Sequence, residues 1–447
     1  MVSIPPPGFR ALPLSIAQLS LSAVLKCGQS FRWMTIPVTN PSFSELNPAF
    51  EYRLTLKDRV VCLRQTSDTL FYRGLYPTLG HGALSDSRKD DETLVWLRDY
   101  FQLDVDLLSL YDEWSIRDPV FKKIKDRFSG IRILRQDPWE CLMSFVCSQN
   151  NHISRITNMV QALCTNFSSP ILSLPAPDGT LSHYYPFPSP SALAGPGTAT
   201  KLRSLGFGYR AEYIQRTAQM LVEMQKEGPS SNLDPEIYLR SLRTKPTDEA
   251  RGALLKFVGV GRKVADCVLL MSLDKHDVVP VDTHVYQIAV KDYGLRGNKS
   301  GSKVTMTPKL YDEIQKRLSP VWGRYAGWAH SVLFTSDLKA FSEYGLETPK
   351  SESVSKKTGL PTPEPSLSPE KPRQRKPKAQ SRSQTIKPEP DVIGEILTLP
   401  ITPVKRKRGV IDTDVSPVPL VDSGSLAERV KQRRRTQLQP KVEPVSA

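Results

Sequence analysis

The sequence predicts an α+β protein: an antiparallel β-rich N-terminal domain, then an all-helical domain, then a disordered basic tail. Three observations predict this order: β-favouring runs in the opening part, helical periodicity after it, and the end of all aromatic residues before residue 348. We place the β-rich domain at residues 1–120, the helical domain at 121–347 and the tail at 348–447.

The β-rich domain is inferred from short apolar runs that turn residues separate. Residues 51–56 and 60–63 are rich in aliphatic, aromatic and β-branched side chains, which favour strands. From about Phe121 the pattern becomes helical, as at residues 139–146, 153–163 and 210–224. Residues 168–200 are rich in Ser, Pro, Gly and Tyr, and we expect them to form a loop between helices.

The tail has none of the 36 aromatic residues and holds 15 of the 38 prolines. A segment of this composition cannot bury enough apolar surface to offset the entropy lost on ordering, so we expect it to be disordered. It contains 20 basic and 11 acidic residues, a balance of +9, and the first 347 residues have a balance of +6. The charge favours a nucleic-acid partner, but a modest basic excess also occurs in proteins that bind none.

The six cysteines include no Cys-x-x-Cys pair, and the sequence shows no signal peptide or long apolar span. We therefore expect a reduced, intracellular protein without a membrane segment. Asp282 and His284 could suggest a metal site, but no third ligand is placed near them in the sequence. We expect no metal and no cofactor.

A helix-hairpin-helix is predicted at about residues 247–273. Thr247 and the two acidic residues after it favour a helix start, an apolar run continues to Leu255, and Gly259 and Gly261 break it. A second helix should open near Arg262. Its unpaired N-terminal amides, next to the two glycines, predict a site for an anion such as a phosphate.

Lys263 falls in the first turn of the second helix, and Cys267 and Met271 follow at i+4 and i+8 on the same face. The helix dipole and burial both disfavour an ammonium there, so we expect the amine to be neutral near pH 7. A neutral amine and the fixed carboxylate of Asp282 are what a Schiff-base enzyme needs. Singly, the same residues are as well explained by a solvated lysine, a core cysteine and a helix cap.

These motifs resemble a known family. Residues 258–267 (VGVGRKVADC) and 279–284 (VPVDTH) resemble the eukaryotic 8-oxoguanine DNA glycosylase/lyases of the helix-hairpin-helix glycosylase superfamily. The resemblance implies a bifunctional enzyme that removes 8-oxoguanine opposite cytosine from duplex DNA and cleaves the strand by β-elimination through a lysine Schiff base. Further matching segments, in family order before about residue 347, are 27–33, 147–151 with Arg155, 206–210, and 326–330 leading to Phe334.

The resemblance also implies a role for each candidate residue. By resemblance, Lys263 attacks the sugar and Asp282 stabilises positive charge on it. The damaged base is bound by Gly28, Cys267, Met271, His330 and Phe334, and the opposite base and the duplex wedge involve Asn150, Arg155, Tyr209 and Arg210. Phosphate is held by Gly259, Gly261 and His284. In the family, the Gly28 carbonyl accepts the N7 hydrogen that 8-oxoguanine has and guanine lacks. From residue types alone, we favour an ordinary polar loop at residues 149–152 and a core aromatic at Tyr209; the family resemblance reverses that preference.

The chain departs from the family pattern at two positions. Val258 stands where the family commonly has proline, and His330 replaces the glutamine that reads the Watson-Crick edge of the flipped base. A histidine there predicts pH-dependent recognition between pH 6 and 8, because protonation removes its acceptor. It also keeps open a glycosylase for another damaged base, and a non-catalytic DNA-binding hairpin is the alternative from a different class.

Three further expectations follow from the sequence. No cysteine follows Cys267, so the iron-sulfur cluster of endonuclease III-type relatives cannot form after the catalytic aspartate. Basic clusters at residues 405–408 and 431–435 favour the nucleus, while the absence of acidic residues before Glu45 leaves the mitochondrion as the alternative. We expect a monomer whose partner is damaged double-stranded DNA.

Overall fold

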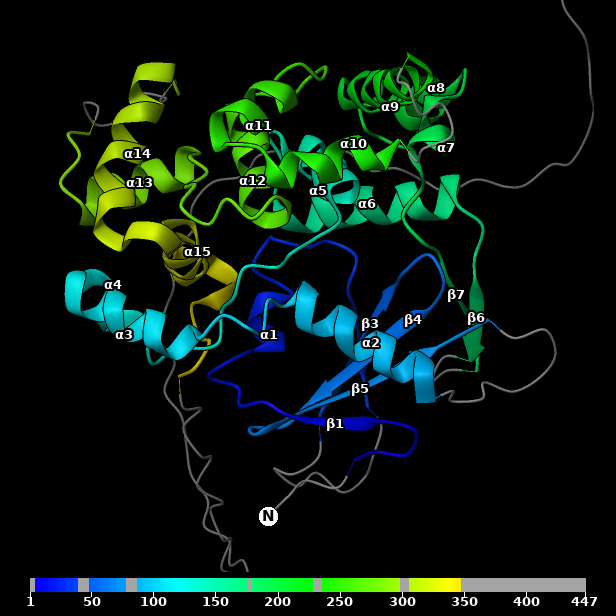
Figure 1. The fold of residues 1–447 in the computed structure, drawn as a ribbon, viewed down its shortest axis with the longest axis horizontal. Helices are drawn as coiled ribbons and strands as arrows, with labels where there is room; N and C mark the ends of the chain where they lie inside the picture. The colour runs from blue at the N-terminus through cyan, green and yellow to red at the C-terminus, as the bar shows by residue number, and fades with distance from the viewer. Residues whose placement is uncertain are drawn as a thin grey trace, which may run out of the picture. The chain divides into compact units, whose positions relative to one another are not determined.

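The computed structural model describes residues 5–38, 48–77, 87–175, 179–227, 235–297 and 305–346. The described residues belong to one compact unit, in which a five-stranded sheet adjoins a group of helices (Figure 1). This arrangement confirms the predicted α+β class. The predicted disordered tail lies outside the described residues, and the domain limits at 120 and 347 stay predictions.

The sheet is antiparallel throughout, with the strand order β1-β5-β4-β3-β2. Both runs predicted as strands lie in it, as β3 and β4, with Tyr52 paired to Leu63. The strands are β1 (Arg10–Pro13), β2 (Met34–Pro37), β3 (Phe50–Thr55), β4 (Val60–Gln65) and β5 (Thr69–Leu75).

Alternation along the strands gives the sheet two buried faces. Tyr52 and Leu63 pack on one face in a cluster with residues of helix α2 (Ser87–Tyr100). Cys62 and Phe71 belong to a smaller cluster on the other face. The sheet is thus covered on both sides, which explains why its strands are apolar on both faces.

Residues 168–200 are not a loop, so that prediction is wrong. They include a hairpin of β6 (Leu172–Pro175) and β7 (Leu181–Tyr184). The buried ring of Tyr184 packs in the smaller cluster of the sheet, with Cys62 and Phe71. Its hydroxyl accepts a 2.5 Å hydrogen bond from Arg53 Nη1. Contact with a sheet distant in sequence stabilises strands that the local Ser, Pro and Gly content did not predict.

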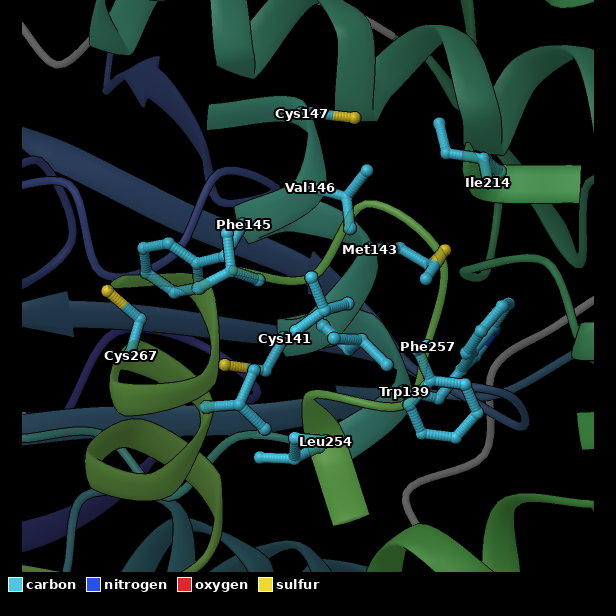
Figure 2. Packing of buried hydrophobic residues seen from close by; sticks show 14 of the residues in the cluster. Trp139, Cys141, Met143, Phe145, Val146, Cys147, Ile214, Leu254, Phe257 and Cys267 are labelled. Atoms are coloured by element: carbon cyan, nitrogen blue, oxygen red, sulfur yellow. The ribbon is translucent and has the colours of Figure 1, made fainter. Parts of the chain in front are cut away.

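Helix α5 (Pro138–Ser148) is the centre of the helical part, and nine of its eleven residues are buried. Asp137 caps its start by accepting hydrogen bonds from two backbone amides. Helix α12 (Arg262–Ser272) packs on it. Figure 2 shows the side chains that fill this core, including Phe145 from α5 and Cys267 from α12.

The remaining helices pack around this centre in two apolar clusters. The clusters share Met271 at their margin, so α12 contributes to both. In chain order these helices are α1 (Leu21–Val24), α3 (Leu107–Arg117), α4 (Pro119–Ile124), α6 (Ile153–Phe167), α7 (Pro190–Ala194), α8 (Thr198–Ser204), α9 (Arg210–Glu227), α10 (Glu236–Ser241), α11 (Thr247–Leu254), α13 (Thr283–Asp292), α14 (Pro308–Trp322) and α15 (Ala326–Asp337), with 3-10 turns at Leu242–Thr244, Gly323–Tyr325 and Lys339–Phe341.

Helices α11 and α12 form the predicted helix-hairpin-helix. Helix α11 begins at Thr247, as its start signal predicted, and Gly261 directly precedes α12. The turn between them contains Gly259 at φ +78°, a left-handed conformation that favours glycine.

Helix α15 approaches α12 closely because its second residue is glycine. A Cβ atom on Gly327 would lie 2.4 Å from both the Cδ1 atom of Leu270 and the carbonyl oxygen of Val278. The Gly327 amide donates a 2.9 Å hydrogen bond to the carbonyl of His276. The position of α15 therefore depends on the absence of a side chain at residue 327.

We expect Gly327→Ala to lower the free energy of unfolding by about 1–3 kcal/mol, the usual cost of forcing a methyl group into a packed core. Gly252→Ala is the matched control, because a Cβ atom there meets nothing within 4 Å. The control should raise stability by about 0.5–1 kcal/mol through helix propensity. Urea denaturation measures both, and equal stability of the two variants would contradict the close approach of α15.

Candidate functional site

A pocket with about 460 Å³ of empty volume opens between the segment after α1 and helices α5, α12 and α15. All seven residues predicted for catalysis or for the base pocket line it. They are Gly28, Lys263, Cys267, Met271, Asp282, His330 and Phe334. The sequence therefore identified one site from segments that lie far apart in the chain.

The backbone at Gly28 is held in place by its buried neighbour. Gly28 has a φ of +88°. The side-chain amide of Gln29 donates to the carbonyl of Arg132 at 2.8 Å and accepts from the amide of Leu134 at 3.0 Å. These bonds fix a short irregular segment at the pocket wall without any helix or strand to hold it.

Lys263 and Cys267 share the face of α12 that lines the pocket, as their i, i+4 spacing predicted. The Nζ atom of Lys263 lies 5.0 Å from the centroid of the Phe145 ring, within range of a cation–π contact. Burial raises the pKa of the Cys267 thiol to about 11, although Lys263 lowers it. The thiol is therefore protonated and uncharged at neutral pH.

The pKa of the Lys263 amine lies above its ordinary value. Burial lowers this pKa, but Cys267 and Asp282 raise it by more. The prediction of a neutral amine near pH 7 is therefore wrong for the protein without DNA. That prediction considered only the helix dipole and burial, and it left out the effects of Cys267 on the same helix and of Asp282 from another segment, which both raise this pKa.

Asp282 is both the cap of helix α13 and a wall of the pocket. Its Oδ1 atom accepts hydrogen bonds from the backbone amides of His284 at 2.9 Å and Val285 at 3.0 Å. No other hydrogen bond reaches its second carboxylate oxygen from the residues that the structure describes. Asp282 therefore caps α13 through one oxygen and also lines the pocket, so the cap and site readings of this aspartate are compatible.

A second, larger cleft with about 1770 Å³ of empty volume adjoins the pocket. Lys263 and Asp282 line both spaces. Of the predicted DNA contacts, Asn150, Arg155, Gly259 and Gly261 also line the cleft. The cleft thus joins the hairpin turn and the loop after α5 to the reactive pair.

The hairpin turn is held against both α9 and the loop after α5. A Cβ atom on Gly259 would lie 2.2 Å from the ring of Tyr213, so only glycine allows this approach. The side-chain amide of Gln149 donates a 2.6 Å hydrogen bond to the Gly259 carbonyl, and Thr217 donates to the carbonyl of Val258 at 3.2 Å. These contacts leave the turn ordered at the edge of the cleft.

The predicted wedge residues are placed differently from one another. Asn150 adopts φ +50°, an uncommon conformation for a residue other than glycine, and Tyr209 is 49% exposed. Arg210 is buried and its guanidinium donates to the carbonyl of Gln149, while also stacking on the Tyr209 ring. A contact from Arg210 to a base would require those bonds to rearrange.

His284 does not line the cleft. Its Nε2 atom lies 3.0 Å from Asp337 Oδ2, and its ring packs edge-on against Phe334 at 5.0 Å between centroids. Its role as a phosphate contact stays a prediction.

Sequence reasoning missed three residues of the site. Phe145 lies under the Lys263 ammonium, Gln149 holds the hairpin turn, and Asp337 pairs with His284. Two of them had a readable signal: Gln149 lies within the matching segment 147–151, and Asp337 follows Phe334 by three positions on the same helix face. Phe145 resembles any other core aromatic in its helix.

Neither a candidate metal site nor a candidate membrane-spanning helix is found among the described residues. Among these residues, no group of three or more His, Cys, Asp or Glu side chains is placed to hold a metal ion. None of the described helices combines the length and apolar character needed to cross a membrane.

Comparisons with known proteins show the family of the chain. The N-terminal domain of 8-oxoguanine DNA glycosylase matches residues 11–142, and the HhH-GPD superfamily of base excision DNA repair proteins matches residues 143–311. The chain is 38% identical over 345 residues to the N-glycosylase/DNA lyase of Saccharomyces cerevisiae, which covers 74% of this chain and 86% of that protein. The chain belongs to the 8-oxoguanine DNA glycosylase family.

Further members of this N-glycosylase/DNA lyase family show the same relationship. The Arabidopsis thaliana N-glycosylase/DNA lyase OGG1 is 35% identical over 336 residues, covering 75% of this chain and 81% of that protein. A solved structure of the Clostridium acetobutylicum 8-oxoguanine glycosylase/lyase, in complex with dsDNA containing cytosine opposite 8-oxoG, is 26% identical with a TM-score of 0.55. That match covers 71% of this chain and 91% of the Clostridium chain.

His330, the departure from the glycosylase family pattern, is buried on α15 and lines the pocket. Its Nε2 atom has no hydrogen-bond partner among the described residues. Burial lowers the pKa of its imidazole to about 4, although Asp282 raises it. The imidazole is therefore neutral from pH 6 to 8, and the predicted pH-dependent recognition in that range is wrong.

The pH dependence of stability tests this burial. The folded-state pKa of His330 is about 4, below its ordinary 6.5, so the unfolded chain binds the proton more tightly. The contribution to stability is complete above about pH 7 and is lost as the pH falls towards 4, by up to about 3 kcal/mol. As the pH is lowered from about 7 to 4, we expect the free energy of unfolding to fall more steeply in the wild type than in His330→Gln. Parallel profiles in urea denaturation would contradict a buried neutral imidazole.

Proposed function

We propose that this chain excises 8-oxoguanine paired with cytosine in duplex DNA and cleaves the strand by β-elimination through a Schiff base on Lys263. The observation that carries the proposal is the shared position of Lys263 and Asp282, which line both the small pocket and the larger cleft. A flipped base in the pocket and a duplex in the cleft would place the sugar between these two side chains. Relatives with this activity support the same reading.

The chemistry begins with the loss of a proton from Lys263, because its pKa is raised in the free protein. Bound DNA displaces water from the pocket, and this added burial favours the neutral amine. The amine nitrogen then bonds to C1′ as the bond from C1′ to the base breaks. The electron pair leaves with the base, which takes up the proton that Lys263 released. A second nitrogen proton passes to O4′ as the C1′–O4′ bond breaks and the opened sugar forms an imine. The imine acidifies the C2′ hydrogen, and loss of that proton to water expels the 3′ phosphate.

Asp282 stabilises the positive charge that develops on the sugar. Its Oδ1 atom is fixed by two backbone amides, so the second oxygen keeps one direction during the reaction. The two bonds to backbone amides restrict rotation of the carboxylate, so the reaction needs little reorganisation of this group.

The pocket wall provides recognition of the base. The Gly28 carbonyl accepts the N7 hydrogen of 8-oxoguanine and would face an unshared pair on guanine, which leaves the carbonyl unpaired. Cys267 and Phe334 meet opposite faces of the base from α12 and α15. His330 offers one hydrogen-bonding nitrogen to the Watson-Crick edge, and a neutral imidazole can serve as donor or acceptor there.

The loop after α5 and the start of α9 read the opposite strand. Asn150 at the cleft and the exposed Tyr209 fill the gap left by the flipped base. Arg155 and Arg210 donate to the cytosine acceptors. The exposed Arg155 must release one 3.3 Å bond to the Gly206 carbonyl, whereas the buried Arg210 must release its bonds to the Gln149 carbonyl.

Several finer statements belong to the same proposal. We propose that the protein acts as a monomer and works in the nucleus, with the mitochondrion as an alternative location. The support for import is the pair of basic clusters in the tail, outside the described residues. The single hydrogen-bonding nitrogen of His330 supports a second candidate, a glycosylase for another damaged base, which a panel of lesion duplexes would distinguish.

A borohydride trap tests the nucleophile. We expect wild-type protein to form a covalent adduct with a duplex that contains 8-oxoguanine opposite cytosine, and Lys263→Gln to form none, because only an amine gives a reducible imine. Lys256→Gln is the control, since it makes the same change at an exposed lysine close by in the chain. An adduct with Lys263→Gln would assign the chemistry to another group.

The opposite-base preference tests the cleft. Arg155→Gln should reduce the ratio of excision rates for cytosine over adenine opposite the lesion by about tenfold, since a good base contact contributes roughly 1–3 kcal/mol of discrimination. Arg216→Gln is the control, because Arg216 is exposed on α9 and pairs with Glu212. Single-turnover rates with both duplexes give the ratio, and an unchanged ratio in Arg155→Gln would remove this residue from opposite-base reading.

A further inference from the structure

Helix α12 presents different polar groups to its two sides. Lys263 and Cys267 line the pocket, whereas Asp266, which lies between them in the sequence, is fully buried away from it. A buried carboxylate is costly unless its oxygens accept hydrogen bonds. The surroundings of Asp266 therefore have to supply donors.

Three side chains from two other helices supply them. The Oδ1 atom of Asp266 accepts from Arg251 Nε on α11 at 2.7 Å. The Oδ2 atom accepts from the Tyr311 hydroxyl at 2.7 Å and from Gln315 Nε2 at 3.0 Å, both on α14. Arg262 adds positive charge nearby, with its Nε atom 3.9 Å from Oδ2. The carboxylate is thus fully coordinated by donors.

Two of these donors also bond to the segment that precedes Asp282. The Tyr311 hydroxyl accepts a 3.0 Å hydrogen bond from the Val281 amide, and Gln315 Nε2 donates to the Val279 carbonyl at 2.8 Å. Residues 278–282 form no helix or strand, and Pro280 has no amide hydrogen to donate. Side-chain bonds are therefore a main restraint on where this segment lies.

We propose that Asp266 is a positioning residue for the reaction: through Tyr311 and Gln315 it fixes Asp282 relative to Lys263. Asp266 and Lys263 lie three residues apart on one rigid helix, so the position of the Asp266 carboxylate is fixed relative to the backbone of Lys263. The Tyr311 hydroxyl bonds to both the Asp266 carboxylate and the Val281 amide, so it links this helix to the backbone next to Asp282. The inference rests on the proposed function, in which the two side chains act on one sugar.

Tyr311→Phe tests the proposal, because it removes only the hydroxyl and leaves Asp266 with Arg251 and Gln315. The matched control is Tyr293→Phe, which removes a partly buried tyrosine hydroxyl that donates to Asp118 at the same 2.7 Å. Both variants should lose a similar few degrees of Tm, since each loses a hydrogen bond to a carboxylate. Only Tyr311→Phe should affect the site.

The kinetic readout separates positioning from stability. At saturating protein, we expect the single-turnover rate of excision by Tyr311→Phe to fall about tenfold or more, as small misplacements of reacting groups do. The Kd for lesion DNA should not change, and Tyr293→Phe should keep the wild-type rate. Equal rates for the two variants would overturn the proposal. Asp266→Asn should lower the rate further, since the neutral amide weakens the bonds to its donors.

Amide hydrogen exchange tests the same proposal without any activity. We expect exchange at residues 281–285 to be faster in Tyr311→Phe than in wild type and unchanged in Tyr293→Phe. Unchanged exchange in Tyr311→Phe would overturn the positioning role even if the enzyme is active. A wild-type protein that releases no base and forms no borohydride adduct would instead overturn the proposed function, so the two failures are distinguishable.

Discussion

The structure around the site depends on how helix α12 satisfies its polar groups while its apolar residues pack against α5. An unpaired buried charge costs on the order of several kcal/mol, so the carboxylate of Asp266 requires donors in place. Arg251 and Tyr311 supply them from α11 and α14. Lys263 meets the opposite requirement, because its ammonium lies over the Phe145 ring and within the field of Asp282. Satisfying both faces of one helix brings together the elements that form the pocket.

A second set of contacts links the two sides of the cleft. The Gln149 side chain bonds to the carbonyl of Gly259 in the hairpin turn, and the Gln149 carbonyl accepts from Arg210 at the start of α9. Gln149 therefore links the turn predicted to hold a phosphate to the residues predicted to read the opposite strand. A shift of either segment changes the geometry of the other, which suits the proposed simultaneous contact with the lesion strand and the opposite strand.

Local patterns predicted the parts of the fold that depend on local physics. The i, i+4, i+8 spacing of Lys263, Cys267 and Met271 gave the correct face of α12, and the strand runs at 51–56 and 60–63 lie in the sheet. The errors came from distant contacts. Within residues 168–200, strands β6 and β7 form a hairpin that packs against the sheet, and the pKa of Lys263 depends partly on Asp282, which is distant in sequence. The pKa of His330 depends on burial that no local spacing reveals.

The protonation of the pocket follows from the same neighbours. In the free protein Cys267 and Asp282 raise the pKa of Lys263, and His330 is neutral. In the proposed reaction, positive charge develops on the sugar beside Asp282. That charge opposes the effect of the carboxylate on the amine, and it acts in the same direction as the burial by DNA that favours the neutral amine before attack. Asp282 therefore has two roles in the proposed mechanism: it favours the ammonium in the free protein, and it stabilises the charged sugar during the reaction.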